Sequence, residues 1–142
     1  MTAPSNVRTN NRWLPIALWA AQILLALMFG TAGVMKTFML PADLAAMGLN
    51  YATELPLPLL RFIGIAELAG ALGIILPAVS RILPWLTPLA AVGLIVIQIL
   101  AIGFHAMRGE LAMALPINLV LLGLAVFVLW GRAKKAPIAT RT

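Results

Sequence analysis

The sequence contains no cysteine and only one histidine among its 142 residues. The absence of cysteine excludes disulfide bonds, thiolate metal sites and any dithiol electron relay within the chain. A single histidine cannot supply a metal site with several histidine ligands or a bis-histidine haem site, so we predict no metal-binding residues. Thiol and metal chemistry are therefore the first function classes to be set aside.

Charge is also scarce, and negative charge most of all. Only 10% of the residues are charged, with four Asp or Glu residues against ten Lys or Arg residues. Soluble domains carry about 25% charged residues. Because 63% of this chain is hydrophobic, we predict an integral membrane protein whose main surroundings are the lipid bilayer.

Four apolar runs are each close to the roughly 20 residues that a helix needs to cross a bilayer. The second and third connections between them are short, so consecutive spans should be antiparallel neighbours. We predict an all-α, antiparallel four-helix bundle with a polar N-terminal tail (1–12), a transmembrane domain (13–132) and a basic C-terminal tail (133–142). The predicted spans are 14–35, 59–79, 86–104 and 111–130.

The first connection, residues 36–58, is longer than the others and rich in apolar residues. A connection of this composition is not expected to extend into water. We predict one short amphipathic helix near Ala42–Leu49, which lies over the outer mouth of the bundle as a lid.

The basic residues flank the spans and do not form a patch with interleaved aromatic residues, which argues against a nucleic-acid partner. Seven of the ten fall on the side that holds both termini, and three tryptophans stand at span ends on that same side. By the positive-inside rule, both termini are predicted to be cytoplasmic, in a multi-pass protein of the cell (inner) membrane. The tryptophans are Trp13, Trp85 and Trp130.

Glu67 is a lone carboxylate inside the second span. An ionisable group there costs about 2.5–3.5 kcal/mol on insertion scales, so a partner, water or a function must offset the cost. Gly64, Gly70 and Ala71 share its helical face, which predicts that the carboxylate points into the bundle. Two interpretations stand: Glu67 pairs with a neighbouring base and fixes helix packing, or it serves a ligand or a proton.

Four further polar residues fall toward the same end of the spans as Glu67. Each has a simple structural explanation, such as snorkelling of a lysine, a lipid-phosphate anchor for an arginine, an interfacial histidine or a capping asparagine. Their gathering in one leaflet under a lid predicts a ligand-binding pocket, in which Glu67 and His105 form one coupled site. No catalytic residue is assigned. The four are Lys36, Arg61, His105 and Asn118.

The stretch Arg61–Gly73 combines an arginine, a Gly-x-x-Glu pattern and further glycines, while Gly33–Lys36 ends the first span with Gly-x-x-Lys. With His105 late in the third span and Asn118 early in the fourth, about residues 14–130 resemble the DoxX-like family of small four-span membrane proteins. The resemblance implies a four-helix membrane fold. It also implies links to redox systems, such as the membrane subunit of a thiosulfate:quinone oxidoreductase, or to a chaperone of receptor assembly.

Three functions follow as alternatives. The first is an accessory subunit of a membrane oxidoreductase system that binds a quinone-like or lipid molecule in the outer pocket and has no other cofactor. The second is a proton-coupled carrier of small molecules, and the third is an assembly chaperone or scaffold for other membrane proteins. A catalytic activity of its own and a homo-oligomeric state are left open, and the partner would be a redox enzyme or another membrane protein. A small molecule that co-purifies with the protein would distinguish the first function from the others.

Overall fold

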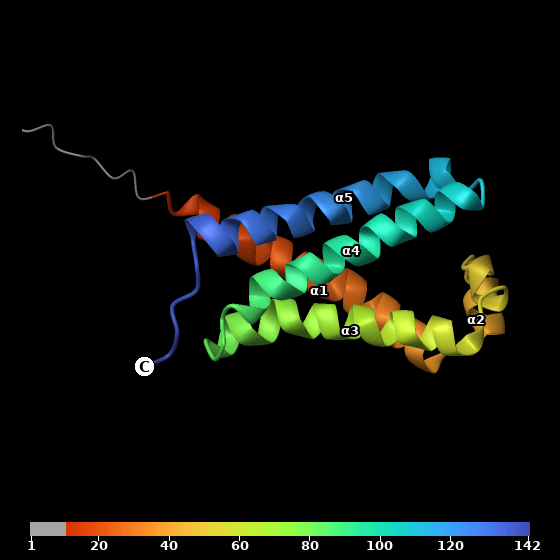
Figure 1. The fold of residues 1–142 in the computed structure, drawn as a ribbon, viewed down its shortest axis with the longest axis horizontal. Coiled ribbons are helices and arrows are strands. Elements are labelled where there is room, and N and C mark those ends of the chain that lie inside the picture. The colour runs from red at the N-terminus through yellow and green to blue at the C-terminus, as the bar shows by residue number, and fades with distance from the viewer. Residues whose placement is uncertain (1–10) are drawn as a thin grey trace, which may run out of the picture.

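The computed structural model describes residues 11–142, which contain helices and no strand. Four helices are long and apolar enough to cross a membrane, and they confirm the all-α prediction (Figure 1). Each observed helix lies within a few residues of its predicted span. The four are α1 (Trp13–Phe38), α3 (Leu57–Ser80), α4 (Leu86–Met107) and α5 (Leu111–Trp130).

Proline marks the start of several helices. A proline stands in the first turn of α1, of α3, of α4 and of the short helix α2 (Pro41–Ala46). The backbone N–H groups of a first turn have no partner within the helix, so a proline there removes no hydrogen bond and fixes a helical φ angle. These prolines are Pro15, Pro41, Pro58 and Pro88.

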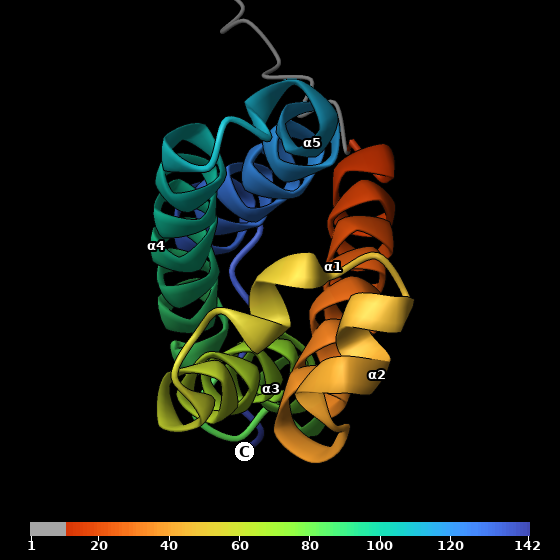
Figure 2. The ribbon, with the colours of Figure 1, turned by 90° about the vertical axis from the view of Figure 1, so that its right-hand side faces the viewer.

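The four long helices form a ring in which α1 packs on α3, α3 on α4, α4 on α5, and α5 on α1 (Figure 2). One end of the bundle holds the first described residues, the α3–α4 connection and the C-terminus, and we call it the termini end. The other holds residues 39–56 and the α4–α5 connection, and we call it the lid end. The interior between them contains a core of small and branched apolar side chains from all four helices.

Glycines let α1 and α3 approach closely. A Cβ atom added to Gly33 would lie 2.8 Å from the backbone oxygen of Gly64, and one added to Gly64 would lie 2.8 Å from the backbone nitrogen of Thr37. Neither position has room for a larger residue. This close crossing brings the last turns of α1 beside the first half of α3, where Glu67 lies.

Helices α3 and α4 approach most closely nearer the termini end. A Cβ atom on Gly70 would collide with a methyl carbon of Leu94, and one on Gly73 would lie 2.9 Å from the Cβ of Ala90. Toward the lid end, a cavity separates the same two helices. The bundle is therefore closed at the termini end and hollow below the lid.

The predicted lid helix is present, with different bounds. Helix α2 ends at Ala46, short of Leu49, because Gly48 takes a φ of 94° that breaks the helix. A single 3-10 turn, η1 (Asn50–Thr53), follows. Leu44 of α2 and Ala52 of η1 are buried together with Leu60 of α3, which holds the lid on the bundle.

Helix α5 continues beyond Trp130 as a π-helical segment, η2 (Gly131–Lys135), so the helical chain includes the first three residues of the predicted tail 133–142. Arg132 of η2 is buried. Its Nε donates a hydrogen bond to Oε1 of Gln22 at 2.7 Å, and Gln22 Nε2 donates to the backbone oxygen of Ile74 at 2.7 Å. Its guanidinium also lies over the ring of Trp19, 5.4 Å from the centroid. This polar cluster joins α1, α3 and η2 at the termini end.

Candidate functional site

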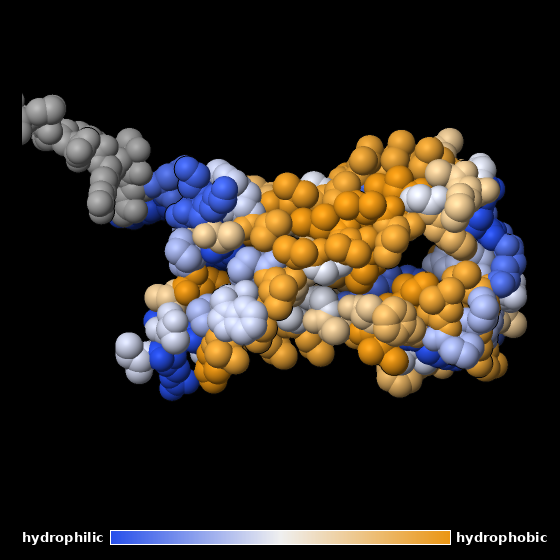
Figure 3. All heavy atoms as spheres, viewed as in Figure 1, coloured by the Kyte–Doolittle hydropathy of each residue, from blue (hydrophilic) through white to orange (hydrophobic). Residues whose placement is uncertain are grey.

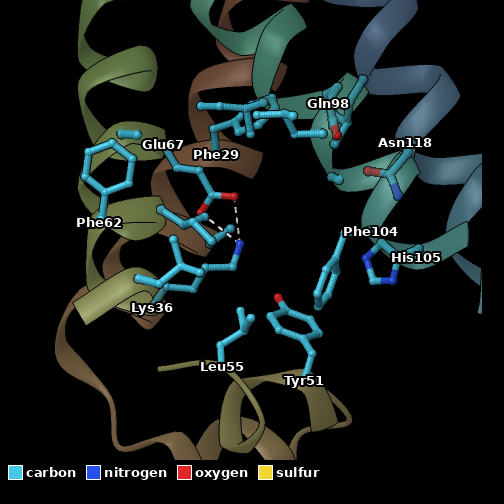
Figure 4. A pocket seen from close by; sticks show the side chains of 18 of the residues that line it. Phe29, Lys36, Tyr51, Leu55, Phe62, Glu67, Gln98, Phe104, His105 and Asn118 are labelled. Atoms are coloured by element: carbon cyan, nitrogen blue, oxygen red, sulfur yellow. Dashed lines mark hydrogen bonds and ion pairs between the residues drawn. The ribbon is translucent and has the colours of Figure 1, made fainter. Parts of the chain in front are cut away.

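A cavity of about 470 Å³ lies under the lid and is lined by all four long helices and by the lid itself. This volume falls within the range of sites for small molecules. Its walls are mostly apolar, and Figure 4 shows a few polar side chains that converge on it. The polar lining residues are Lys36, Tyr51, Glu67, Gln98, His105 and Asn118.

Glu67 and Lys36 form an ion pair in the wall of the cavity. Nζ of Lys36 donates to both carboxylate oxygens of Glu67, at 2.7 and 2.8 Å. The side chains are only 11% and 7% exposed, so the predicted inward orientation of Glu67 is confirmed, and Lys36 does not snorkel to the surface. Both residues line the cavity, so the ion pair forms part of its wall.

The lid contributes Tyr51, the only tyrosine of the chain. Its hydroxyl points into the cavity on the side where Lys36 lies (Figure 4). Burial raises the pKa of Tyr51, with the negative charge of Glu67 acting in the same direction and the positive charge of Lys36 opposing it. The phenol therefore stays protonated at neutral pH and is available as a hydrogen-bond donor.

His105 stands on the opposite side of the cavity and takes part in two clusters. Its ring packs edge-on against the rings of Tyr51 and Phe104, with centroids 5.9 and 5.7 Å away. Its Nδ1 lies 3.2 Å from Oε2 of Glu110 in the α4–α5 connection. The contact with Glu110 fixes the ring so that Nε2 is the nitrogen left for a ligand.

A network of ion pairs closes the lid end. Arg108 pairs with Glu110 at 2.8 Å and also with Glu54, which follows η1 in the lid. Hydrogen bonds from Arg108 lower the pKa of both carboxyl groups. Arg108 thus links the lid to the α4–α5 connection.

Asn118 and Gln98 lie deeper in the cavity (Figure 4). The side-chain nitrogen of Asn118 donates to the backbone oxygen of Ala114, one turn earlier in α5, at 2.7 Å. Asn118 therefore does not cap the exposed amides of its helix, and its carbonyl oxygen is the group available to a ligand. Gln98 is 3% exposed and lies in the same cavity wall as His105, as their spacing along α4 predicts.

Arg61 is the predicted site residue that the structure places elsewhere. Its Nη1 donates to the backbone oxygens of Lys36 and Met39, at 2.7 and 2.8 Å, and the residue does not line the cavity. Carbonyl groups at the C-terminus of a helix lack partners within that helix. Arg61 satisfies them at the end of α1, so it positions Lys36 and does not itself face a ligand.

Glu67 and His105 line one cavity but lie on opposite sides of it (Figure 4). Each has its own charged partner, Lys36 for the first and Glu110 for the second. Glu67 and His105 are therefore not paired directly, although the sequence predicted one coupled site. The base that pairs with Glu67 is Lys36 of α1, and the sequence alone does not place Lys36 beside α3. A ligand that fills the cavity would be the link between the two residues.

The cavity also has a side that faces the membrane. Leu59, Phe62 and Leu100 line it and are nevertheless 43%, 68% and 67% exposed. They belong to α3 and α4, which are close together only nearer the termini end. Figure 3 shows the hollow among apolar side chains near the lid end, so the cavity opens on the apolar surface of the bundle.

Sequence reasoning missed Tyr51 as a site residue. It stands outside the spans, where the chain gives no periodic signal of which side chain turns inward. The one available clue is that a lone tyrosine occurs in a loop predicted to cover the pocket. The cluster of Gln22 and Arg132 was also missed, because those residues are 110 positions apart.

The family model described as DoxX-like matches residues 20–128, which covers most of all four spans. The chain belongs to the DoxX-like family. The comparisons with curated proteins and with solved structures gave no match. Within residues 11–142 of this DoxX-like protein, no three His, Asp or Glu side chains are grouped so that they could hold a metal ion.

Proposed function

We propose that this DoxX-like protein binds a quinone-like or lipid molecule, with its polar head under the lid and its apolar body between α3 and α4. The observation that carries the proposal is the lined cavity itself, which has polar donors at one end and a side that opens among exposed apolar residues. A ligand dissolved in the bilayer could enter from that side without crossing water.

The donors that face the cavity suit a ligand with oxygen acceptors. An ammonium group has three N–H donors, and Lys36 uses two of them on Glu67. The third, together with the Tyr51 hydroxyl, can donate to one carbonyl or hydroxyl oxygen. On the far side, His105 Nε2 and the Asn118 carbonyl can meet a second polar group. Phe104 stands near both sets and offers a flat apolar surface for a ring.

The role as an accessory subunit of a membrane oxidoreductase system is part of the same proposal. The chain has no cysteine, and no three His, Asp or Glu side chains of residues 11–142 are grouped as metal ligands. The proposal therefore assigns electron transfer to a partner enzyme. Family membership supports a membrane role of this kind but does not specify the partner.

Filling the cavity tests the proposal. Ala101 lines the cavity on α4, and Ala106 is an exposed residue of the same helix that does not line it. In the purified protein, a short-chain ubiquinone analogue and a phospholipid would be added separately, and bound ligand measured by native mass spectrometry and by thermal shift. We expect the wild type to bind one of the two probes, and Ala101→Trp to lose that binding.

The matched control is Ala106→Trp, which adds the same side chain on the outside of α4 and should bind as the wild type does. Equal binding by Ala101→Trp and Ala106→Trp would show that the ligand does not occupy this cavity. A wild-type protein that binds neither probe would overturn the proposal. Binding that is lost in both variants would indicate general damage to α4 and would also count against the cavity.

A further inference from the structure

Charge is divided unequally between the two ends of the bundle. All four acidic residues of the sequence belong to the lid end or to the cavity beneath it. The termini end of the described chain has basic side chains only, with no acidic side chain to balance them. They are Arg12, Arg81, Arg132, Lys134, Lys135 and Arg141.

The C-terminal tail, residues 136–142, brings two of these basic residues together. It leaves η2 and crosses the termini end toward the α3–α4 connection (Figure 1). There, Nε of Arg81 donates to the backbone oxygen of Ala139 at 3.1 Å, and the backbone nitrogen of Arg141 donates to the backbone oxygen of Arg81 at 3.0 Å. The backbone of Arg141, an exposed residue, is thus held against Arg81, which is also exposed.

The position of Arg81 adds a second observation. It follows α3 with a φ of 60°, the left-handed conformation at which glycine is the usual residue after a helix. A side chain is unfavourable there, so the arginine carries a conformational cost, as does Leu83 of the same connection with a φ of 49°. Its guanidinium uses Nε on the tail, which leaves both terminal nitrogens as donors for an external acceptor.

The residues after Arg81 indicate what kind of molecule accepts hydrogen bonds from its guanidinium group. Ile82, Leu83 and Trp85 are 60%, 53% and 58% exposed. Exposed apolar and indole side chains beside basic groups are typical of a membrane interface, where the apolar parts enter the acyl region and the charges meet phosphates. A soluble phosphate compound would leave these apolar side chains in water.

We propose that Arg81 and Arg141, held together by the C-terminal tail, bind the phosphate of an anionic phospholipid in the leaflet at the termini end. The two guanidinium groups supply planar N–H pairs that match phosphate oxygens. The lipid also removes the repulsion between the arginines and so stabilises the tail on the α3–α4 connection. This site is at the opposite end of the bundle from the cavity and does not depend on the proposed function.

The test is a lipid titration of the full-length protein in detergent, followed by native mass spectrometry. Phosphatidylglycerol is the anionic probe and phosphatidylcholine the neutral one. We expect the wild type to retain phosphatidylglycerol preferentially. Because each guanidinium would donate charge-assisted hydrogen bonds directly to the phosphate, Arg81→Gln and Arg141→Gln should each lower that affinity about tenfold. Binding of phosphatidylcholine should change little.

Arg12→Gln is the matched control, because it removes the same charge from an exposed residue of the same end that does not contact the tail. It should keep the wild-type preference for phosphatidylglycerol. An equal loss in all three variants would show general charge attraction and overturn the site. Displacement of the lipid by millimolar inorganic phosphate would identify a soluble-phosphate site and overturn the lipid assignment.

Discussion

The ion pair of Lys36 and Glu67 explains how a lone carboxylate is tolerated inside a membrane-spanning helix. Two charges taken out of water are costly, and only their mutual attraction with good hydrogen-bond geometry offsets the loss of hydration. Here Lys36 donates to both oxygens of Glu67. The structure therefore shows the pairing interpretation, and because both side chains also line the cavity, a ligand role for Glu67 stays a prediction beside it.

Glu67→Gln should destabilise the protein by about 3–5 kcal/mol, because it leaves the ammonium group of Lys36 buried without a counter-charge. The double variant Lys36→Met/Glu67→Met removes both charges and should be more stable than the sum of the single effects indicates. Thermal unfolding in detergent measures the stability of the single and the double variants. Glu54→Gln is the control, since its side chain is 57% exposed and its loss should have a far smaller effect.

If Lys36→Met and Glu67→Met instead gave strictly additive losses, the two groups would not interact energetically. The account of Glu67 as one half of a buried pair would then be wrong, whatever the distance between the atoms.

Among the elements, α1 and α3 position the site. Their crossing at Gly33 and Gly64 sets the separation of the helices, and Arg61 fixes the last turn of α1 by binding its free carbonyl groups. The lid then covers the cavity and is tied to the α4–α5 connection through Arg108 and Glu54. Polar groups from separate helices therefore meet because backbone contacts hold the helices in place.

Gly33→Ala should destabilise the bundle by about 1–3 kcal/mol through overpacking, because the new methyl group would meet backbone atoms of α3 at 2.8–2.9 Å. Gly30→Ala is the matched control one turn earlier. Its methyl group would meet only the Cβ of Ala71, at 3.7 Å, and alanine favours the helix by about 0.5–1 kcal/mol. Thermal unfolding of the two variants should thus shift in opposite directions, and equal shifts would contradict the close crossing.

At the scale of the whole molecule, the two ends differ in charge and in construction. Both described termini regions and the α3–α4 connection share one end, while the lid and the α4–α5 connection share the other (Figure 1). The even number of spans requires this arrangement. The basic residues at the termini end then predict that it faces the cytoplasm.

The absence of native cysteine makes this orientation simple to measure. A single cysteine at Asn50, which is exposed in the lid, should react with a membrane-impermeant thiol reagent in intact cells. A single cysteine at Thr140, exposed in the tail, should react only after the membrane is permeabilised. Labelling of Thr140→Cys in intact cells, with Asn50→Cys protected, would reverse the predicted orientation.

The sequence by itself determined the membrane class, the four spans and the lid, because span length and hydropathy follow directly from the thickness of the bilayer. It also determined that Glu67 faces inward, since the small residues around it recur with the helical period. His105 and Asn118 could be assigned to the same end because consecutive spans alternate in direction.

Only the tertiary structure decided which groups meet. Lys36 pairs with Glu67, Arg61 turns to backbone carbonyls and Tyr51 enters the cavity, because the crossing of α1 and α3 and the path of the lid fix distances that hydropathy does not encode. Likewise, the tail places Arg141 against Arg81 across 60 residues of sequence. Contacts between helices depend on the rotation and separation of each helix, and those are set by packing of the whole bundle and not by any one span.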